Sequence, residues 1–271
     1  MKIEAFFHTN PVFRHDEFAS LKAGQGVYNP RAVCKALLYY TNTARLINVR
    51  RGIYAVVPPG VPADQVSVDP YLLAGKASID SVLAYHTALE LHGLAYSAFE
   101  QFTFLTAQKI KPFEFRGQRF QPVALSVALK KSGDSNFGIE EMDRQGMTIR
   151  VTNLARTFVD VLDRVQFCGG WEEVVRSISN MATLDVDAVV KYCLLLNNRI
   201  LAAKTGFFLE QRQGAFRVSN DVLQPLIDKK PLTPQSLVAH EREGGQLVKR
   251  WNLILPVRIL KKSWEEPDHD V

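Results

Sequence analysis

Residues 29–57 read NPRAVCKALLYYTNTARLINVRRGIYAVV, and this stretch decides the fold expected at the N-terminus. Its first residues, Asn29 and Pro30, predict a helix start, because asparagine caps helices well and proline is tolerated at the first helical position. We expect this helix to run to about Thr43. Apolar residues recur along it at the spacing of a core-facing stripe, at Val33, Leu37 and Tyr40.

The second half of the stretch, residues 45–57, predicts a β-hairpin. Its side chains alternate and many are β-branched, and Gly52 supplies a turn residue directly after Arg50 and Arg51. The hairpin would follow the helix with almost no linker. This succession is typical of a DNA-recognition helix followed by a wing.

An earlier helix is predicted from residues 10–11, where Asn-Pro repeats the same capping signal. It would end at the break in residues 22–26, which read KAGQG. Its apolar stripe would consist of Val12, Phe13, Phe18 and Leu21. Two helices and a hairpin together predict a winged helix-turn-helix over residues 1–60.

The charge of the chain is concentrated in the same segment. The full sequence of 271 residues carries 33 Lys and Arg against 28 Asp and Glu, a net charge of +5. Residues 1–60 contain eight of these bases and three of these acids, so the remaining bases and acids cancel. Such an asymmetry indicates a small module that meets a polyanion, attached to a neutral body.

Double-stranded DNA is the polyanion that fits this module, because basic side chains gain affinity by displacing counterions from its phosphates. The helix would enter the major groove and the hairpin turn would reach the neighbouring backbone. The expected DNA-contact residues are Asn29, Arg31, Lys35, Asn42, Arg45, Arg50 and Arg51. The alternative interpretation is a solvated basic helix and hairpin that binds a protein or has no partner.

Three prolines and a glycine in residues 58–62 end the basic segment. We therefore expect a first domain over residues 1–60 and a second over residues 61–271. Helices are expected over residues 69–76, 78–91, 153–165, 171–181, 185–196 and 200–211. Strands are expected over residues 101–107, 147–152 and 251–257, with a hairpin over residues 113–120. This mixture predicts an α+β fold.

The sequence carries no enzyme signature: it has no P-loop, no HExxH and no nucleophile elbow. Its six histidines lack metal-ligand spacing, so we expect no enzyme, no cofactor and no metal. A nuclease using Asp160, Asp163 and Glu210 remains an alternative, without the lysine usual in such a cluster. Five phenylalanines are interpreted as core, with a base-stacking platform as the alternative; they are Phe102, Phe104, Phe113, Phe115 and Phe120.

Three cysteines at long spacings, without a CxxC pair, fit a reducing compartment. The sequence also lacks the apolar run of a signal peptide and any apolar stretch of about 18 residues. We therefore expect a soluble, cytoplasmic protein.

Four stretches, taken in order, resemble the AbiEi family of antitoxins, which also repress their own operons. The first is the expected wing, residues 49–57, and the last is the glycine pair at 169–170 before a helix. Residues 78–94 resemble the family pattern S-x-x-S-A-L-x-x-H-G-L, although this chain separates Ser81 from Ala88-Leu89. Residues 151–162 resemble its pattern V-T-x-x-x-R-T-x-x-D. The motif residues carried over are Ser81, His92, Arg156, Thr157 and Asp160.

The resemblance implies a winged helix that binds inverted repeats in the promoter of its own operon. It also implies a C-terminal antitoxin domain that counters a nucleotidyltransferase-like toxin encoded beside it. Antitoxins of this family are not generally thought to act by simple tight binding to the toxin. Arg156 and Asp160 stand four residues apart and can pair on one helix face, either as an internal salt bridge or as part of a partner surface. The alternative functions are a stand-alone DNA-binding regulator and a protein-binding antitoxin or adaptor.

Overall fold

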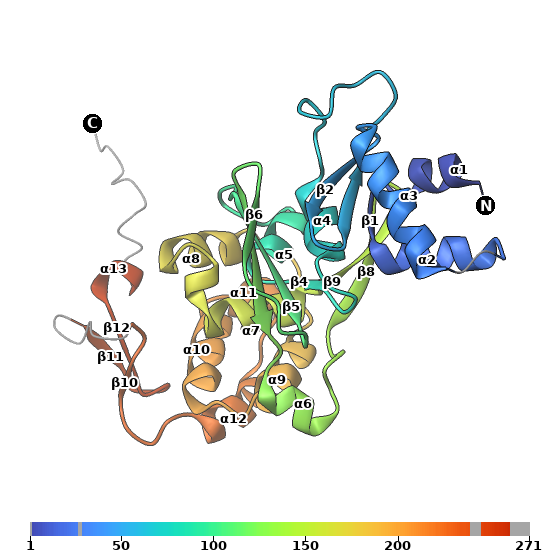
Figure 1. The fold of residues 1–271 in the computed structure, drawn as a ribbon. Helices are drawn as coiled ribbons and strands as arrows, with labels where there is room; N and C mark the ends of the chain where they lie inside the picture. Colours follow the sequence, from blue (N-terminus) through green and yellow to red (C-terminus); the bar gives the residue numbers. More distant parts are fainter. Residues whose placement is uncertain (1, 27–28, 239–244, 261–271) are drawn as a thin grey trace, which may run out of the picture. The chain divides into compact units, whose positions relative to one another are not determined.

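The computed structural model describes residues 2–26, 29–238 and 245–260 (Figure 1). The described residues form a mixture of helices and three sheets, with six strands in the largest sheet and three in each of the others. This arrangement confirms the expected α+β fold. No helix within these residues is long and apolar enough to cross a membrane.

The chain divides into two compact units that do not follow the expected domain boundary. The first unit is assembled from residues 1–83, 100–123 and 141–150, and the second from residues 84–99, 124–140 and 151–271. The proline-rich residues 58–62 lie inside the first unit. Each unit is therefore built from segments that are far apart in the sequence.

The N-terminal part of the first unit combines three helices with a three-stranded antiparallel sheet of order β1-β3-β2. The elements are α1 (Ile3–Thr9), β1 (Val12–Arg14), α2 (His15–Gly24), α3 (Pro30–Asn42), β2 (Leu46–Arg50) and β3 (Ile53–Val56). Their shared core is mostly aromatic and consists of Phe6, Phe7, Phe13, Phe18, Val33, Leu37 and Leu46.

The helix α3 and the hairpin confirm two predictions. The Asn29 side chain caps α3 by accepting a hydrogen bond from the Arg31 backbone N–H at 2.9 Å, and Pro30 is the first helical residue. Gly52 in the hairpin turn has a φ of +83°, which favours glycine. Both elements are determined by short-range signals.

The helix expected from residues 10–11 is wrong at its start. Residues Val12–Arg14 form the strand β1 instead, in register with β3, and Val12 pairs with Ala55. The helix α2 starts only at His15, where Glu17 accepts a hydrogen bond from the Arg14 backbone N–H. Pairing with a strand forty residues away overrides the local capping signal, and α1 was not predicted.

A six-stranded sheet of order β6-β7-β5-β4-β9-β8 follows in the chain. Its strands are β4 (Val82–Leu83), β5 (Gln101–Thr106), β6 (Phe113–Phe115), β7 (Gln118–Ala124), β8 (Ile139–Arg144) and β9 (Met147–Thr152). The expected strands at 101–107 and 147–152 and the hairpin at 113–120 are confirmed. The strand β8 was not predicted.

The helix expected over residues 78–91 is wrong in its first half. Val82 and Leu83 form β4 and pair with Leu105 and Phe104 of β5, so that α5 spans only His86–Leu91. The Asp80 carboxylate accepts hydrogen bonds from the Thr106 hydroxyl and the Ala107 backbone N–H, both at 2.6 Å. These contacts hold the segment against β5 and exclude a helix.

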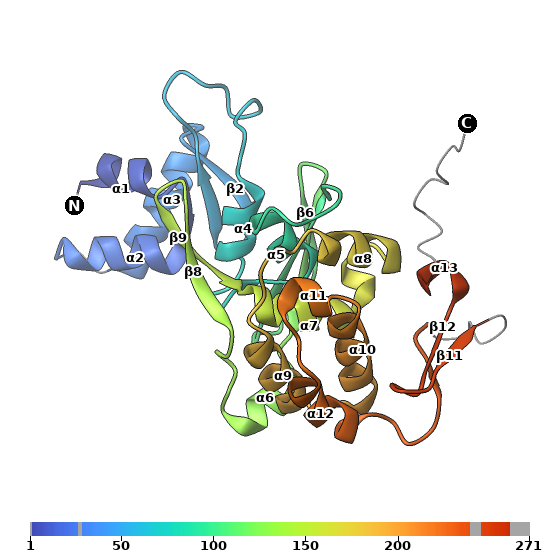
Figure 2. The same ribbon diagram turned by 180° about the vertical axis from the view of Figure 1, so that it is seen from behind.

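The second unit is mainly helical, and α9, α10 and α12 lie side by side in it (Figure 2). The helices expected at 153–165, 171–181, 185–196 and 200–211 are confirmed as α7 (Leu154–Asp163), α8 (Trp171–Ser179), α9 (Val186–Leu195) and α10 (Arg199–Glu210). The remaining helices of the described residues are α4 (Pro70–Lys76), α6 (Val127–Ser132), a 3-10 turn (Val165–Phe167), α11 (Gln213–Phe216), α12 (Asn220–Lys229) and α13 (Val257–Leu260).

A separate small sheet of order β10-β12-β11 lies near the C-terminus. Its strands are β10 (Gln235–Ser236), β11 (Gln246–Val248) and β12 (Leu253–Leu255), and β12 accounts for the strand expected at 251–257. Trp251 is completely buried and donates a hydrogen bond from its indole N–H to the Glu210 carboxylate at 2.6 Å. The C-terminal segment is thereby attached to α10.

Candidate nucleic-acid interface

The helix α3 has one buried face and one exposed face. Val33 and Leu37 are almost fully buried in the aromatic core. The opposite face exposes basic, polar and apolar side chains: Arg31, Lys35, Leu38, Tyr39 and Asn42. Leu38 and Tyr39 are 60% and 62% exposed. This face offers charge, hydrogen-bond donors and apolar contact together.

The acids of residues 1–60 are all paired with bases that lie off this face. Glu4 accepts a hydrogen bond from Arg45 at 2.7 Å, and Asp16 accepts one from Arg14 at 3.0 Å. Glu17 pairs with Lys76 and also lies 3.8 Å from Arg14. No ion pair among the described residues involves Arg31, Lys35 or Arg51. The three acids therefore leave the exposed bases of α3 and of the hairpin turn unneutralised.

Three of the seven expected DNA-contact residues have internal roles. The Asn29 side chain is the helix cap, and Arg45 holds Glu4. The Arg50 guanidinium is half-buried and stacks 4.5 Å from the ring centre of Phe113 in β6. Burial lowers the pKa of Arg50, which still stays charged at neutral pH because arginine titrates far above it.

The other four expected contact residues are exposed, and they are Arg31, Lys35, Asn42 and Arg51. Arg51 lies in the turn of the hairpin, and the other three lie on α3. Sequence reasoning found these residues from their charge and position. It could not find the partners of Arg45 and Arg50, because those partners come from distant parts of the chain.

The residues of the antitoxin-family motifs form internal hydrogen bonds, and all of them are buried except His92, which is partly buried. Ser81 accepts a hydrogen bond from the Ser78 backbone N–H at 2.9 Å, and His92 lies 2.8 Å from the Thr152 carbonyl oxygen. Thr157 donates to the Thr152 carbonyl at 3.0 Å. Their pattern therefore describes how this part of the chain folds.

Arg156 and Asp160 form the internal salt bridge that was one of their two interpretations. Arg156 is 1% exposed, and its Nε lies 3.4 Å from the Asp160 carboxylate. It also donates to the backbone carbonyls of Ser135 and Phe137, at 3.2 and 2.7 Å. The pair ties α7 to the segment before β8 and presents no surface to a partner.

The residues suggested for a nuclease do not form a site. Within the described ranges, no group of three or more His, Cys, Asp or Glu side chains is arranged to hold a metal ion. Asp160 accepts from the Tyr192 hydroxyl at 2.7 Å, and Glu210 accepts from Arg250 at 2.6 Å. Among the phenylalanines, Phe102, Phe104 and Phe120 are buried as core, and Phe113 and Phe115 are partly buried.

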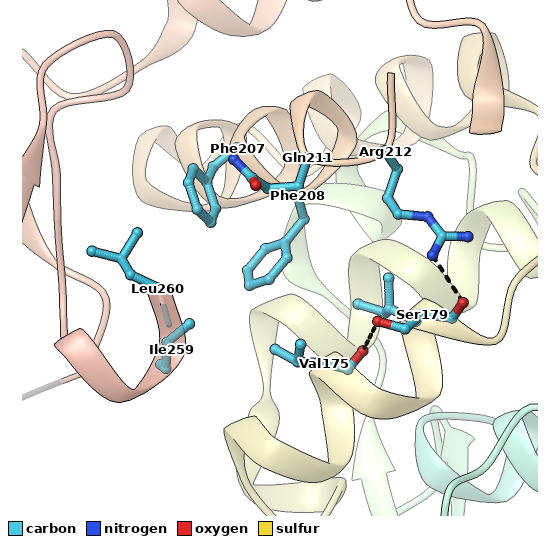
Figure 3. Close-up of a pocket in the computed structure, with 9 residues that line it drawn as sticks. Val175, Ser179, Phe207, Phe208, Gln211, Arg212, Ile259 and Leu260 are labelled. Atoms are coloured by element: carbon cyan, nitrogen blue, oxygen red, sulfur yellow. Dashed lines mark hydrogen bonds between the residues drawn. The ribbon is translucent and has the colours of Figure 1, made fainter. Parts of the chain in front are cut away.

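The second unit contains a cavity of about 140 Å³ between α8, α10 and α13 (Figure 3). Its walls are mostly apolar, with Val175, Phe207 and Phe208 on one side and Ile259 and Leu260 on the other (Figure 3). Arg212 at its edge donates to the carbonyls of Ser179 and Met181, at 2.8 and 2.6 Å. Among the described residues, the lining contains one ionisable side chain, that of Arg212.

Comparison with known proteins finds a similar fold among solved structures. No protein-family model matches the chain, and no curated protein matches it. Its structure is similar to the crystal structure of the Rv2827c protein from Mycobacterium tuberculosis, with a TM-score of 0.58 and 14% sequence identity. The similarity covers 95% of this chain and 92% of that chain. At this identity the likeness concerns the fold, which the two chains share over nearly their whole length.

Proposed function

We propose that this protein binds double-stranded DNA through its N-terminal elements, which act as a winged helix. The order α1-β1-α2-α3-β2-β3 supplies two successive helices followed by a hairpin, the arrangement that such a module requires. In this proposal α3 is the recognition helix and the β2–β3 hairpin is the wing. The observation that carries the proposal is the basic face of α3, whose charge no acidic side chain of residues 1–60 neutralises. All three acidic residues of this segment form ion pairs with basic residues outside that face.

The contacts follow from the exposed side chains. Arg31 and Lys35, near the start of α3, would meet phosphates or base edges, and Asn42 would meet the duplex about two turns beyond Lys35. Arg51 would reach the neighbouring backbone from the wing. Leu38 and Tyr39 would supply apolar contact, such as that offered by a thymine methyl group.

The test is a fluorescence-anisotropy titration of the full chain on the duplex that lies upstream of its own reading frame. If about three basic side chains contact phosphates, the logarithm of the affinity falls with the logarithm of the salt concentration at a slope of about −3. Replacing Arg31 and Lys35 by alanine should weaken binding on the order of 100-fold and flatten the slope. The matched control replaces Lys130 and Lys131, two exposed lysines of α6, and should bind like the wild type.

Equal affinity of the Arg31→Ala/Lys35→Ala variant and the wild type would refute the role of α3. Binding that does not depend on salt would refute the phosphate contacts. A composition-matched scrambled duplex separates sequence-specific from non-specific binding, since only the former loses affinity there.

We further propose that the protein is a cytoplasmic antitoxin that represses its own operon, and that it catalyses no reaction itself. The support is the four ordered stretches that resemble the AbiEi family. Two of them contain the motif residues, most of which are buried, so they support a shared fold more directly than a shared binding surface. Its functional partner would be a nucleotidyltransferase-like toxin.

The adjacent gene tests this part of the proposal. If it encodes such a toxin, its expression alone should arrest growth, and co-expression with this chain should restore growth. Growth arrest that persists in the presence of this chain would refute the antitoxin role and leave a stand-alone DNA-binding regulator.

A further inference from the structure

The wing is attached to the six-stranded sheet by one stacking contact. The Arg50 guanidinium lies 4.5 Å from the centre of the Phe113 ring, and Phe113 is the first residue of β6, an edge strand. Both residues belong to the first unit. Stacking of a guanidinium on an aromatic face is a favourable contact that holds the two elements together. Residues 107–112 directly precede Phe113 in the chain, so the end of this segment lies at the contact with the wing.

This segment is basic and exposed. Lys109 and Lys111 are both exposed, and no ion pair among the described residues involves either of them. The acids nearest in the chain or the sheet have other neighbours: Glu114 stands opposite Arg119 in the β6–β7 ladder, and Asp80 accepts from Ser78, Thr106 and Ala107. The two lysines thus present their charge to solvent.

The positions of Lys109 and Lys111 along the chain are close enough to Phe113 for both side chains to contact a duplex that is bound to the wing. Lys111 stands two residues before Phe113, and Lys109 two residues earlier. At about 3.3 Å per extended residue, the two backbone positions lie within about 7 and 13 Å of Phe113 along the chain. DNA repeats a phosphate about every 3.4 Å of its axis on each strand, so the segment spans several phosphates.

We propose that residues 107–112 form a second phosphate-contact segment for double-stranded DNA, placed beside the wing by the Arg50–Phe113 stack. The inference rests on the proposed DNA binding and extends its surface from the first 60 residues into the sheet. Lys109 and Lys111 contact the backbone and carry no sequence preference, because lysine meets phosphates as a flexible point charge. Arg50 acts as a positioning residue in this arrangement.

The test compares the full-length Lys109→Ala/Lys111→Ala variant with the Lys130→Ala/Lys131→Ala control, which removes the same charge from exposed lysines of the second unit. Affinity is measured by anisotropy against salt, on the upstream duplex and on a scrambled one. The first variant should lose on the order of tenfold in affinity on both duplexes, with a salt slope shallower by about 1–2. The control should keep the wild-type values, and melting temperatures should confirm that both variants fold.

A third variant, Phe113→Ala, keeps every charge and removes the stack. It should weaken binding several-fold in the presence of both lysines, and much less when Lys109 and Lys111 are already alanine. The inference would be overturned if Lys109→Ala/Lys111→Ala kept the wild-type affinity while Arg31→Ala/Lys35→Ala still bound on the order of 100-fold more weakly. An equal loss of affinity in Lys109→Ala/Lys111→Ala and in Lys130→Ala/Lys131→Ala would also overturn the inference, because the loss would then depend only on the net charge of the protein. Absence of binding by the wild-type chain at low salt would instead refute the proposed function.

Discussion

Arg156 illustrates at the level of one residue how the second unit is held together. Its side chain is 1% exposed, and its charge is balanced by Asp160 and by the carbonyls of Ser135 and Phe137. Burial raises the pKa of the Asp160 carboxyl, and the neighbouring Arg156 guanidinium opposes this shift. Because a charge deprived of its counterion inside a protein is costly, each partner is needed once the other is present.

Asp160→Ala should therefore lower the free energy of unfolding by about 3–5 kcal/mol, since it leaves Arg156 buried without its counterion. The measurement is chemical denaturation of the full chain followed by circular dichroism. The exposed Glu141 serves as control, and Glu141→Ala should change the unfolding free energy by less than about 0.5 kcal/mol. Indistinguishable values for the two variants would contradict the structural role of the pair.

Glu173 is a second buried charge, and it predicts a pH dependence. Its carboxylate accepts hydrogen bonds from the backbone N–H groups of Tyr96 and Ser97, each at 3.0 Å, and lies 3.0 Å from His86 Nε2. Burial alone would raise its pKa, but the hydrogen bonds from Ser97 and His86 hold the pKa of Glu173 below its usual value. The folded state therefore prefers the charged carboxylate more strongly than the unfolded state does.

Glu173→Gln should lower the melting temperature at neutral pH, and this difference should shrink on acidification. The stabilisation is fully present above the unfolded pKa of about 4.3 and is lost as the pH falls through the lower folded pKa. Melting curves of both proteins between about pH 3 and pH 7 test this. A difference that stays constant over the whole range would show that the carboxylate charge is not what matters.

At the scale of one element, α3 carries a natural reporter of its exposed face. Cys34 is exposed on α3, whereas Cys168 and Cys193 are buried. Burial raises the pKa of the Cys193 thiol to about 12 and that of Cys168 further still. Thiol reagents attack the thiolate, so burial and the raised pKa values both protect Cys168 and Cys193, whereas Cys34 is accessible.

Ellman's reagent at mildly alkaline pH should thus modify one thiol per folded chain rapidly and all three only after denaturation. Added duplex DNA should slow the reaction of Cys34, because α3 would then face the major groove. A Cys34→Ser variant should show no rapid phase. An unchanged rate at saturating DNA would contradict the placement of α3 against the duplex.

The helix α10 depends on a glycine where Trp251 packs against it. A Cβ atom built on Gly206 would lie 2.1 Å from a ring carbon of Trp251, far inside contact distance. Gly214 in α11 has open space at the same position. The two helical glycines therefore form a matched pair for testing how firmly the C-terminal segment is packed.

Gly206→Ala should destabilise the protein by about 1–3 kcal/mol through overpacking, and should shift tryptophan fluorescence to longer wavelength as Trp251 is displaced. Gly214→Ala should be neutral or stabilising by up to about 1 kcal/mol, because alanine favours the helix. Thermal denaturation and emission spectra provide both readouts. A Gly206→Ala variant with wild-type emission would indicate that Trp251 does not pack on α10.

At the scale of the whole molecule, the two units differ in charge and in expected role. The first unit contains the basic segment together with Lys109 and Lys111, and the second contains the buried motif residues Arg156, Thr157 and Asp160. Hydrogen exchange measured by mass spectrometry should show DNA-dependent protection in α3, in the β2–β3 turn and in residues 107–112. Peptides from α7 to α10 should exchange equally with and without DNA. Protection concentrated in those helices would place the DNA on the second unit and refute the proposal.

Some of this architecture follows from short stretches of sequence. The cap at Asn29, the buried stripe at Val33 and Leu37, and the turn at Gly52 lie within one helix or one hairpin, so the sequence alone predicts α3 and the β2–β3 pair. The α+β class and the helices from α7 to α10 follow from periodicity in the same way. The basic residues exposed on α3 could also be predicted, because their spacing opposes the buried stripe.

The remaining features depend on residues that are distant in the chain. Residues 12–14 and 82–83 became strands because β3 and β5 pair with them, although capping and apolar signals favoured helices. Their charge and position predict Arg45 and Arg50 as DNA contacts, and only the tertiary structure shows that they also contact Glu4 and Phe113. Arg156 and Asp160 could be paired from their spacing, but only packing showed that the pair is buried. Hydrogen bonds between strands and the desolvation of charges are set by the assembled fold, and for that reason no local pattern determines them.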